Sequence, residues 1–307
     1  MKYEVGGIGA VNPTPYNPDG SINENEYRRH IRWLVDCGVR FLQPAAATGQ
    51  SMQTTRDEYR RLLEMTVEEV GSRAFVTAYA GRPDPRETID LINIAQDVGA
   101  HSAFLIQPFF SLPDQEGLYR YYKMVAQNTE LPLVFYNNPS RTGINLSIDV
   151  MDRITDECPN YVGLKQSDIE QYPASVRRLG SKIKVMPKSE HHILFGLTLG
   201  APGVLTFAAS IIPNKVVKIL SAWQDGDLET ARRTYLEWLP LFDAIHIEPV
   251  PNAVHYMLNR MGWCFGQPRV PGHEPSEANK RKLDEILNSL GLLQQDVNSR
   301  PRAQVAG

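Results

Sequence analysis

One lysine stands in a stretch that is otherwise apolar. Lys165 follows residues 162–164, Val-Gly-Leu, in a run that is typical of a buried strand. Loss of water contact favours the neutral amine, and a neutral amine attacks a ketone carbonyl to form an imine. Lys165 is therefore a candidate Schiff-base nucleophile. The alternative is a lysine that extends from the strand end into solvent.

Two further side chains could assist such an amine. Tyr136 ends the apolar run LPLVFY, and a phenol beside a lysine can carry protons to and from the addition intermediate. Arg141 follows in a turn that contains a proline, where its guanidinium could bind a carboxylate through two parallel hydrogen bonds. A packed tyrosine and a surface arginine are the alternative interpretations of the same two residues.

A loop of small residues follows an earlier apolar run. Its sequence AAATGQS occupies residues 45–51 and contains Thr48 and Gly49. Small side chains let backbone N–H groups approach an anion, here a substrate carboxylate, and the Thr48 hydroxyl would add a donor. Short glycine motifs are also common in ordinary loops, so this pattern alone does not identify a site.

The histidines show no metal-binding pattern. His191 and His192 are adjacent and cannot both face one ion from a helix, and no acidic or cysteine residue stands at ligand spacing. We therefore expect no metal site. A metal-dependent class II aldolase would need an acidic or histidine cluster at the strand ends, and inhibition by a chelator would revive that alternative.

The composition is that of an ordinary globular protein. The chain has 307 residues, 42% of them hydrophobic and 22% charged, which is enough to bury a large core. Its formal net charge of −3 gives no basic field for nucleic acid. The longest apolar runs are far shorter than the roughly 20 residues that span a bilayer, and no signal segment is present at the N-terminus. We expect a cytoplasmic protein with no nucleic-acid or membrane partner.

Eight short apolar runs, separated by glycine or proline, must position the candidate residues. Most are apolar at consecutive positions, as in parallel strands that are covered on both faces. Segments with helical spacing lie between them, and several end at the glycine expected of a helix C-cap. The runs occupy residues 6–11, 39–46, 74–81, 102–108, 131–138, 161–167, 183–189 and 202–209.

This alternation predicts an α/β fold, a (β/α)8 TIM barrel with a C-terminal three-helix extension. A doubly wound open sheet is the alternative, but it usually has a glycine-rich phosphate loop after its first strand, and NPTPYNPDG is not one. We place the barrel at residues 1–225, the extension at 226–293 and a disordered tail at 294–307. In such barrels catalytic groups lie at the C-terminal strand ends, where Lys165 and Tyr136 are expected.

Four segments together resemble one enzyme superfamily. They are AAATGQS after the second run, YNNPSRTG at the fifth, GLKQSD at the sixth and GAPGVLTFAA at the eighth. Their order and spacing resemble the dihydrodipicolinate synthase and N-acetylneuraminate lyase superfamily over about residues 6–292. The resemblance implies a (β/α)8 barrel with a helical extension, a homo-oligomer that is a dimer or tetramer, and a small 2-oxo acid as the binding partner.

The resemblance also implies a role for individual residues. Lys165 matches the lysine that forms a Schiff base with pyruvate or another 2-oxo acid, and Tyr136 matches the tyrosine that relays protons. Thr48 and the backbone of Ala47 match the loop that holds the carboxylate of the 2-oxo acid. Leu205 matches the position whose carbonyl faces the imine. This is class I chemistry, for which no cofactor is expected.

The chain departs from the superfamily at positions that bear on the reaction. The family loop usually reads GTTGE, so one relay hydroxyl is lost at Ala47 and one carboxylate at Gln50. The second relay tyrosine of the synthases, which crosses a dimer interface, aligns with Phe110. After the seventh run, MPKSEHH places Lys188 and Ser189 at the distal pocket, where the family more often has a glycine and acidic residues.

These departures favour one reaction over another. Two of the three relay hydroxyls of the lysine-pathway synthases are missing, whereas Lys165 and Tyr136 are retained. We therefore predict a Schiff-base lyase that cleaves a 2-oxo acid with release of pyruvate, or dehydrates a 2-oxo-3-deoxy acid. The alternatives are 4-hydroxy-tetrahydrodipicolinate synthase, which condenses pyruvate with an aldehyde, and a non-catalytic barrel that binds a carboxylate. Arg141 indicates an acidic distal group on the substrate.

Overall fold

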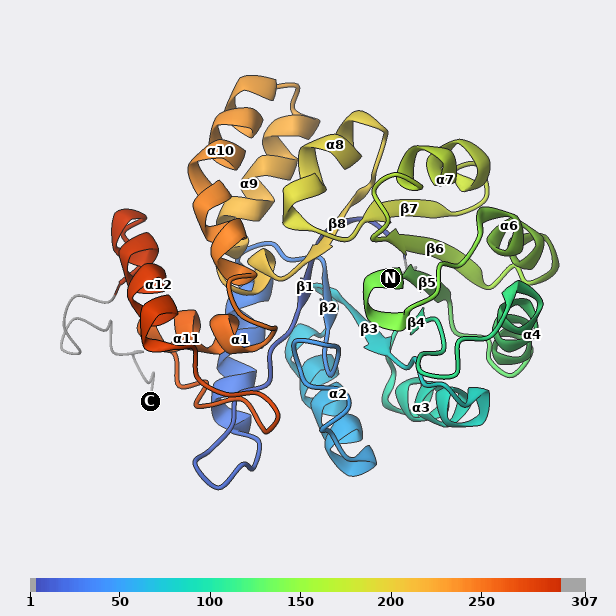
Figure 1. Cartoon of the computed structure of the whole chain (residues 1–307), viewed down its shortest axis with the longest axis horizontal. Coiled ribbons are helices and arrows are strands. Elements are labelled where there is room, and N and C mark those ends of the chain that lie inside the picture. The colour runs from blue at the N-terminus through green and yellow to red at the C-terminus, as the bar shows by residue number, and fades with distance from the viewer. Residues whose placement is uncertain (1–3, 294–307) are drawn as a thin grey trace.

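The computed structural model describes residues 4–293 and shows a ring of parallel strands surrounded by helices (Figure 1). The strand order is β7-β6-β5-β4-β3-β2-β1-β8, and the two ends of this order, β7 and β8, lie against each other. Sequential order around the ring is that of a (β/α)8 barrel, whereas a doubly wound sheet would reverse direction partway. The predicted TIM barrel is confirmed, and the open-sheet alternative is wrong.

Each strand falls within one of the eight predicted apolar runs. The strands are shorter than the runs because the ends of the runs continue into the loops. Their bounds are β1 (Gly7–Val11), β2 (Phe41–Gln43), β3 (Phe75–Tyr79), β4 (Ser102–Ile106), β5 (Leu133–Asn137), β6 (Tyr161–Gln166), β7 (Lys184–Pro187) and β8 (Gly203–Thr206).

Helices cover the outside of the barrel, and the last three form the predicted C-terminal extension. Those around the barrel are α1 (Glu24–Asp36), α2 (Arg56–Val70), α3 (Pro85–Val98), α4 (Gln115–Ala126), α5 (Pro139–Thr142), α6 (Ile148–Glu157), α7 (Tyr172–Leu179), α8 (Ile193–Thr198) and α9 (Pro213–Gln224). The extension consists of α10 (Leu228–Ile245), α11 (Asn252–Arg260) and α12 (Glu277–Ser289), and α10 packs on α9. Within residues 4–293, no helix is long and apolar enough to cross a membrane.

The first helices begin where the sequence supplies capping side chains. Asn23 and Asp84 each accept a hydrogen bond from a backbone N–H of the first turn of α1 and α3. Thr55 and Glu58 form a reciprocal capping box at the start of α2. These caps define the residues at which α1, α2 and α3 begin.

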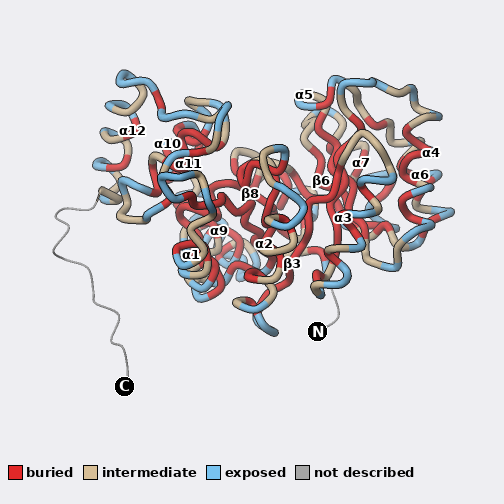
Figure 2. Tube along the Cα trace, turned by 90° about the horizontal axis from the view of Figure 1, so that it is seen from below, coloured by how far each residue is buried: buried red, intermediate tan, exposed pale blue. Residues whose placement is uncertain are grey.

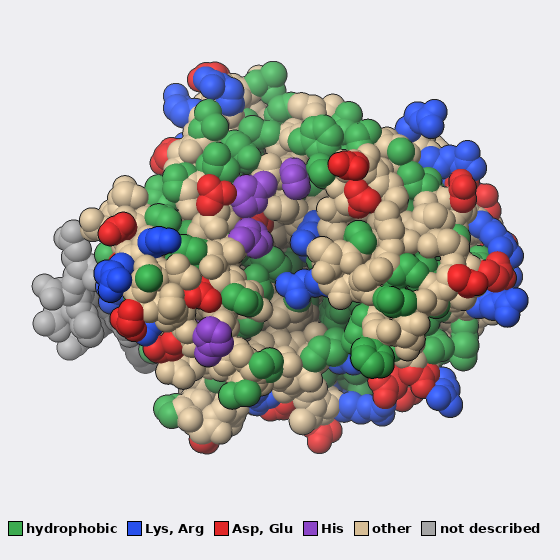
Figure 3. Space-filling model, in the orientation of Figure 1, with side chains coloured by type: hydrophobic (Ala, Val, Ile, Leu, Met, Phe, Trp, Pro, Cys, Tyr) green, Lys and Arg blue, Asp and Glu red, His purple; other side chains and the backbone are tan. Residues whose placement is uncertain are grey.

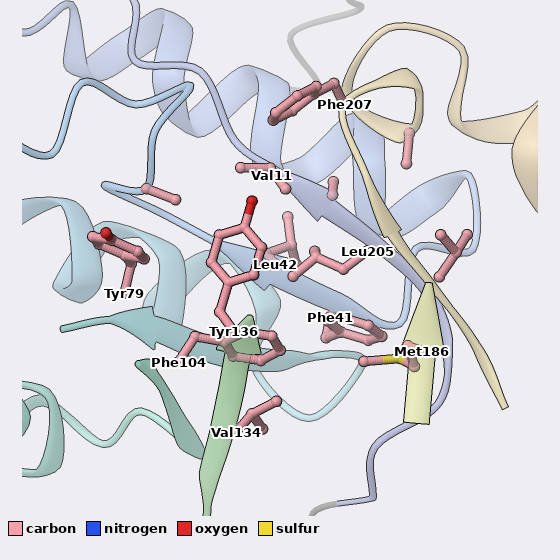
Figure 4. Packing of buried hydrophobic residues seen from close by; sticks show 14 of the residues in the cluster. Val11, Phe41, Leu42, Tyr79, Phe104, Val134, Tyr136, Met186, Leu205 and Phe207 are labelled. Carbon is pink, nitrogen blue, oxygen red and sulfur yellow. The ribbon is translucent and has the colours of Figure 1, made fainter. Parts of the chain in front are cut away.

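The register of the strands determines which side chains face the barrel interior. Directly paired residues of parallel strands point to the same face of the sheet. Tyr136 pairs with Lys165, which in turn pairs with Met186, so these three side chains share one face. Figure 4 shows Tyr136 and Met186 in the interior, and Figure 2 shows that the buried segments follow the strands. Lys165 therefore belongs to the inward-facing row.

Candidate active site

Lys165 lies inside the barrel rather than extending into solvent. Its side chain is on β6 and only 2% of the residue is exposed. The Nζ atom lies 4.8 Å from the centre of the Tyr136 ring. Burial, together with the nearby positive charge of Lys188, lowers the pKa of Lys165 from 10.5 to about 7, although the carboxylate of Glu190 acts in the opposite direction. A large part of the amine is therefore neutral near pH 7, as a nucleophile requires.

Tyr136 lies next to Lys165, on the neighbouring strand β5. Its hydroxyl oxygen accepts a hydrogen bond of 2.7 Å from the Nδ2 group of Asn138. Burial raises the pKa of Tyr136 to about 12, even though the charge of Arg141 acts to lower it. The phenol therefore keeps its proton at neutral pH and can donate it to an oxygen atom near the Lys165 amine.

The loop after β2 presents a hydroxyl that has no protein partner. Thr48 is fully buried, and its Oγ1 atom makes no hydrogen bond with the described residues. A Cβ atom at Gly49 would lie 3.0 Å from the backbone of both Ala45 and Asn12, so the tight loop requires glycine. Because an unsatisfied buried hydroxyl is costly, this donor is suited to a ligand such as a carboxylate.

Gln50 serves a structural purpose that its position in the loop did not suggest. Its Nε2 group donates to the carbonyl oxygen of Arg269 at 2.7 Å, and its Oε1 atom accepts from the Arg269 N–H at 2.8 Å. The Arg269 side chain in turn binds both carboxylate oxygens of Glu58. A glutamate could not supply the donor, which gives a physical reason for glutamine at this position.

Replacing Gln50 by glutamate should therefore destabilise the protein. The carboxylate would face the carbonyl oxygen of Arg269, and a lost hydrogen bond with an unpaired buried acceptor costs about 1–3 kcal/mol. Chemical denaturation at pH 7 measures this change. Gln53→Glu is the matched control, because the Gln53 side chain makes no hydrogen bond with residues 4–293, and it should leave the unfolding midpoint unchanged. Equal midpoints for the two variants would contradict the assignment.

Basic side chains gather at the mouth of the barrel. Arg141 is on α5, is exposed, and lines a cavity of about 510 Å³ together with Ala47 and Tyr79. Lys188 follows β7, and burial followed by the charge of Arg141 lowers its pKa. Figure 3 shows a hollow at the centre of this face with Lys or Arg side chains at its edge. The structure thus brings two cations close to the Lys165 amine.

The other residues that the sequence singled out are Leu205, Ser189 and Phe110. Leu205 is fully buried on β8, and its side chain points into the barrel (Figure 4). Ser189 faces the following turn, where its Oγ atom accepts from the His191 N–H at 3.2 Å. Phe110 is 94% exposed on the loop after β4. Ser189 therefore caps the turn in this structure, and Phe110 presents its ring to the surface.

A cavity larger than the one at the mouth lies at the opposite end of the barrel. It measures about 1100 Å³ and is lined by Ile8, Lys184 and Pro202 among others, at the N-terminal ends of the strands. None of the predicted site residues contributes to it. Catalytic groups in this architecture lie at the C-terminal strand ends, so this cavity is not the candidate active site.

A buried carboxylate beside the mouth was not predicted. Glu190 begins the short turn η1 (Glu190–His192) and is 1% exposed. Its Oε1 atom is 2.7 Å from the Nε2 atom of His246, and its Oε2 atom accepts from the Thr206 hydroxyl. Burial acts to raise the pKa of Glu190, but the hydrogen bonds and charge of His246 outweigh it and keep the pKa low. Glu190 is therefore a carboxylate near three basic groups, which are His246, Lys165 and Lys188.

This cluster corrects the expectation that the histidines lack an acidic neighbour. Ligand atoms of Glu190, His191 and His246 lie within 4.8 Å of one another. No local sequence pattern indicates this cluster, because His246 is far from Glu190 in the chain. Both carboxylate oxygens of Glu190 already accept hydrogen bonds, so we describe the cluster as a hydrogen-bonded network.

Comparison with known proteins places this barrel in a family. Residues 4–290 match the model of the Dihydrodipicolinate synthetase family. The 4-hydroxy-tetrahydrodipicolinate synthase of Thermodesulfovibrio yellowstonii is 34% identical over 282 residues, which cover 91% of this chain and 96% of that protein. The synthase of Methanopyrus kandleri is 32% identical over 296 residues, which cover 95% and 99%.

Solved structures agree with this assignment. The crystal structure of dihydrodipicolinate synthase from Aquifex aeolicus superposes with a TM-score of 0.90 at 31% identity and covers 95% of this chain and 99% of that one. The structure of dihydrodipicolinate synthase from Thermotoga maritima has the same TM-score of 0.90 at 30% identity, with coverage of 94% and 99%. This chain belongs to the dihydrodipicolinate synthetase family.

Proposed function

We propose that this protein is a class I lyase that forms a Schiff base between Lys165 and a 2-oxo acid of the pyruvate type. The observation that carries the proposal is the buried Lys165 amine, with its lowered pKa, 4.8 Å from the ring of Tyr136. The unpartnered hydroxyl of Thr48 supplies a donor for the carboxylate of the acid. Family membership is consistent with this chemistry.

The proposed reaction begins with attack of the neutral Lys165 amine on the C2 carbonyl. Tyr136 delivers a proton to the carbonyl oxygen, which leaves as water when the imine forms. The protonated imine then accepts the electron pair of a breaking bond at the adjacent carbon. Hydrolysis of the imine returns the lysine and releases pyruvate or a dehydrated product.

Two positions favour cleavage or dehydration over condensation. Ala47 has no hydroxyl, and Phe110 has none either, so the relay that the resemblance assigns to the synthases lacks two members here. The second candidate function is nonetheless 4-hydroxy-tetrahydrodipicolinate synthase, because that is the activity named for relatives at 32–34% identity. Product analysis distinguishes the two functions. It should be carried out for the condensation of pyruvate with an aldehyde and for the reverse cleavage.

The substrate is proposed to carry a second carboxylate. Arg141 lines the cavity beside Ala47, and Lys188 is close enough to affect the pKa of Lys165. Arg141 and Lys188 repel each other, since the pKa of Lys188 is lowered by burial and then by the charge of Arg141, even with the Glu190 carboxylate nearby, and a further anion between them would relieve that repulsion. An acidic group at the far end of a 2-oxo acid would supply that anion.

Replacing Lys188 by methionine should raise the KM for a 2-oxo diacid about 10- to 100-fold. The loss corresponds to one charge-assisted contact of about 1.5–3 kcal/mol. Steady-state kinetics with 2-oxo diacids and with pyruvate, which has no second carboxylate, should show a much larger KM increase for the diacids than for pyruvate. Equal KM increases for the two kinds of substrate would show that Lys188 does not bind the distal group.

We also propose that the protein is a homo-oligomer, a dimer or a tetramer. Phe110 and Leu112 are exposed apolar side chains on the loop after β4, and both adopt positive φ angles of 72° and 44°. An exposed loop gains little from holding large apolar groups in this conformation, whereas an interface would bury them. Analytical ultracentrifugation tests the proposal, and a monomer at micromolar concentration would contradict it.

Reductive trapping tests the central proposal. Borohydride added with pyruvate or another 2-oxo acid should attach the acid covalently to the peptide that contains Lys165, as seen by mass spectrometry. If no member of a 2-oxo acid panel leaves an adduct, the Schiff-base function is wrong. Thermal stabilisation by 2-oxo acids that persists in Lys165→Ala would instead favour a non-catalytic carboxylate-binding barrel.

A further inference from the structure

We propose that Asn138 is a positioning residue of this site, which holds the Tyr136 hydroxyl as a proton donor toward the bound 2-oxo acid. The inference rests on the proposed function, because that function makes Tyr136 the group that protonates the carbonyl oxygen. It adds the side chain that decides in which direction the phenol gives its proton. Asn138 lies in the segment YNNPSRTG, in which Tyr136 and Arg141 were the candidate residues.

Asn138 places a buried amide against the phenol. The residue directly follows β5, and its exposed fraction is 0%. Its Nδ2 group donates to the hydroxyl oxygen of Tyr136 at 2.7 Å, and no other side chain among residues 4–293 makes a hydrogen bond to that oxygen. In Figure 4 the Tyr136 ring extends from β5 into the barrel interior. Because the amide is buried, solvent does not compete for this contact.

The amide of Asn138 is not used to cap the helix that follows it. An asparagine that directly precedes a helix usually accepts a hydrogen bond from a backbone N–H of the first turn. Asn138 stands in that position before α5, but its side chain makes no such bond. The common structural reason for an asparagine is therefore absent here, and the contact that the amide does make is the one with Tyr136.

Other contacts hold the backbone of Asn138 in place. Its N–H donates to the Oε1 atom of Gln107, which follows β4, at 3.2 Å. Its carbonyl oxygen accepts from the Thr142 hydroxyl at 3.1 Å and from the Arg141 N–H at 3.0 Å. The backbone is thus fixed relative to both β4 and α5, so the amide can act as a rigid support for the phenol.

Two serine hydroxyls determine which end of the amide faces Tyr136. The Oδ1 atom of Asn138 accepts from the Ser140 hydroxyl at 2.8 Å and from the Ser167 hydroxyl at 3.2 Å. With Oδ1 engaged by these two donors, the Nδ2 group is the end that points to the phenol. A reversed amide would instead offer Oδ1 to the Tyr136 proton and turn that proton away from the substrate.

The N–H donor of Asn138 decides the direction of the Tyr136 proton. A phenol oxygen has one proton, which lies in the plane of the ring, and an amide N–H group cannot accept it. With Asn138 on the acceptor side of the oxygen, the O–H bond points away from Asn138. The relay hydroxyls that the resemblance assigns to the synthases could accept this proton, but Ala47 and Phe110 have none. The amide therefore keeps the proton available to the substrate.

The same hydrogen bond stabilises the phenolate that remains after proton transfer. Burial raises the pKa of Tyr136, whereas the charge of Arg141 and the hydrogen bond from Asn138 act to lower it. A donor to the phenol oxygen favours the ionised form. Tyr136 is therefore a stronger acid with Asn138 than without it, although it still keeps its proton at neutral pH.

The proton transfers balance within the first step of the proposed reaction. The Lys165 amine adds to C2, and the carbonyl oxygen takes the Tyr136 proton as the C–O double bond opens. The nitrogen, which then has a positive charge, returns one proton to the phenolate. The product is a neutral carbinolamine, and Tyr136 is restored for the loss of water that completes the imine.

A double-mutant cycle tests the inference, with pyruvate as the probe and the initial rate of borohydride trapping at saturating pyruvate as the readout. Asn138→Leu should lower this rate about 10- to 100-fold, the loss of one hydrogen bond to a group that becomes charged, and should change the half-saturating pyruvate concentration less than about threefold. In a Tyr136→Phe protein the same substitution should change the rate less than about twofold, because no hydroxyl is left to orient. A merely structural role would lower both rates by the same factor.

Two further variants separate orientation from packing. Asn128→Leu is the matched control, because Asn128 is exposed and bonds to the Met124 carbonyl oxygen, and its trapping rate should equal that of the wild type. Ser140→Ala combined with Ser167→Ala leaves Asn138 in place but lets its amide turn. Trapping by this double variant should slow about threefold or more, and an unchanged rate would contradict the inference. The double variant also keeps the test available if Asn138→Leu does not fold.

The inference is wrong if Asn138→Leu traps pyruvate at the wild-type rate, or if the substitution has the same effect with and without the Tyr136 hydroxyl. It is also wrong if the pH midpoint of trapping moves in Asn138→Leu, because the variant would then have disturbed the Lys165 amine rather than the phenol. These outcomes leave the Schiff-base function intact. Failure of the wild type to trap any 2-oxo acid overturns the proposed function itself, so the two failures are distinguishable.

Discussion

Lys165→Met should abolish turnover and reductive trapping, and the same variant should be more stable than the wild type. Methionine keeps the length of the side chain but has no nucleophile, so the loss of kcat/KM should be on the order of 10⁴-fold or more. Mass spectrometry after borohydride treatment and steady-state kinetics measure the two losses. A gain in stability alongside a loss of activity is the mark of a group placed for chemistry rather than for folding.

The stability gain follows from the lowered pKa of Lys165. The unfolded chain holds the proton up to a pKa near 10.5, whereas the folded chain releases it at about 7. Folding is therefore penalised fully below pH 7, progressively less between pH 7 and 10.5, and not at all above that range. The separation between these two values corresponds to a penalty on the order of several kcal/mol near pH 7.

An exposed lysine on a neighbouring strand gives the matched control. Lys184 begins β7 and is exposed, so Lys184→Met should change neither the thermal midpoint nor trapping. Thermal unfolding of both variants at pH 7 and at pH 10 completes the test. The gain in stability of Lys165→Met over the wild type should be smaller at the higher pH. A Lys165→Met protein that is less stable than wild type, or that still traps pyruvate, would contradict the assignment.

The sequence was a good guide to the barrel because parallel strands leave a strong local signal. A strand covered on both faces must be apolar at consecutive positions, and glycine or proline marks its ends. The run 161–167 begins with consecutive apolar or small residues, and Lys165 stands out in it as the residue that does not fit. The in-register pairing of Tyr136 with Lys165 then needed only the neighbouring order of β5 and β6.

Contacts between loops were not predictable in the same way. Glu190 and His246 are joined only because α10 packs against η1, and no local sequence pattern encodes that packing. From the sequence, Gln50 was interpreted only as the loss of a carboxylate. Its hydrogen-bonding partner, the backbone of Arg269, is distant in the sequence and could not be recognised there. Tertiary geometry, rather than residue type, decides the role of such side chains.

Imine formation should depend steeply on pH, with a midpoint near 7. The nucleophile is the neutral amine of Lys165, and its pKa of about 7 means that the protonated fraction grows as the pH falls. Below pH 7 the rate of adduct formation should therefore decrease about tenfold for each pH unit, and above pH 7 it should level off. An ordinary surface lysine would instead place this midpoint above pH 10.

The charge of Lys188 should contribute to the low pH of this midpoint. Burial is the main cause of the lowered pKa of Lys165, and the positive charge of Lys188 is the next. Removing that charge in Lys188→Met should let the pKa of Lys165 rise, so the midpoint should move to higher pH and the rate at pH 7 should fall. Lys184→Met removes a more distant charge and should leave the midpoint in place.

The measurement must isolate the first step from the later ones. Pre-steady-state trapping with pyruvate reports imine formation alone, because pyruvate does not undergo the later bond cleavage. The midpoint therefore belongs to the amine of Lys165. A trapping rate that stays constant from pH 5 to 8 would show that Lys165 is not the titrating nucleophile, and the buried amine would then have to be explained as a structural feature.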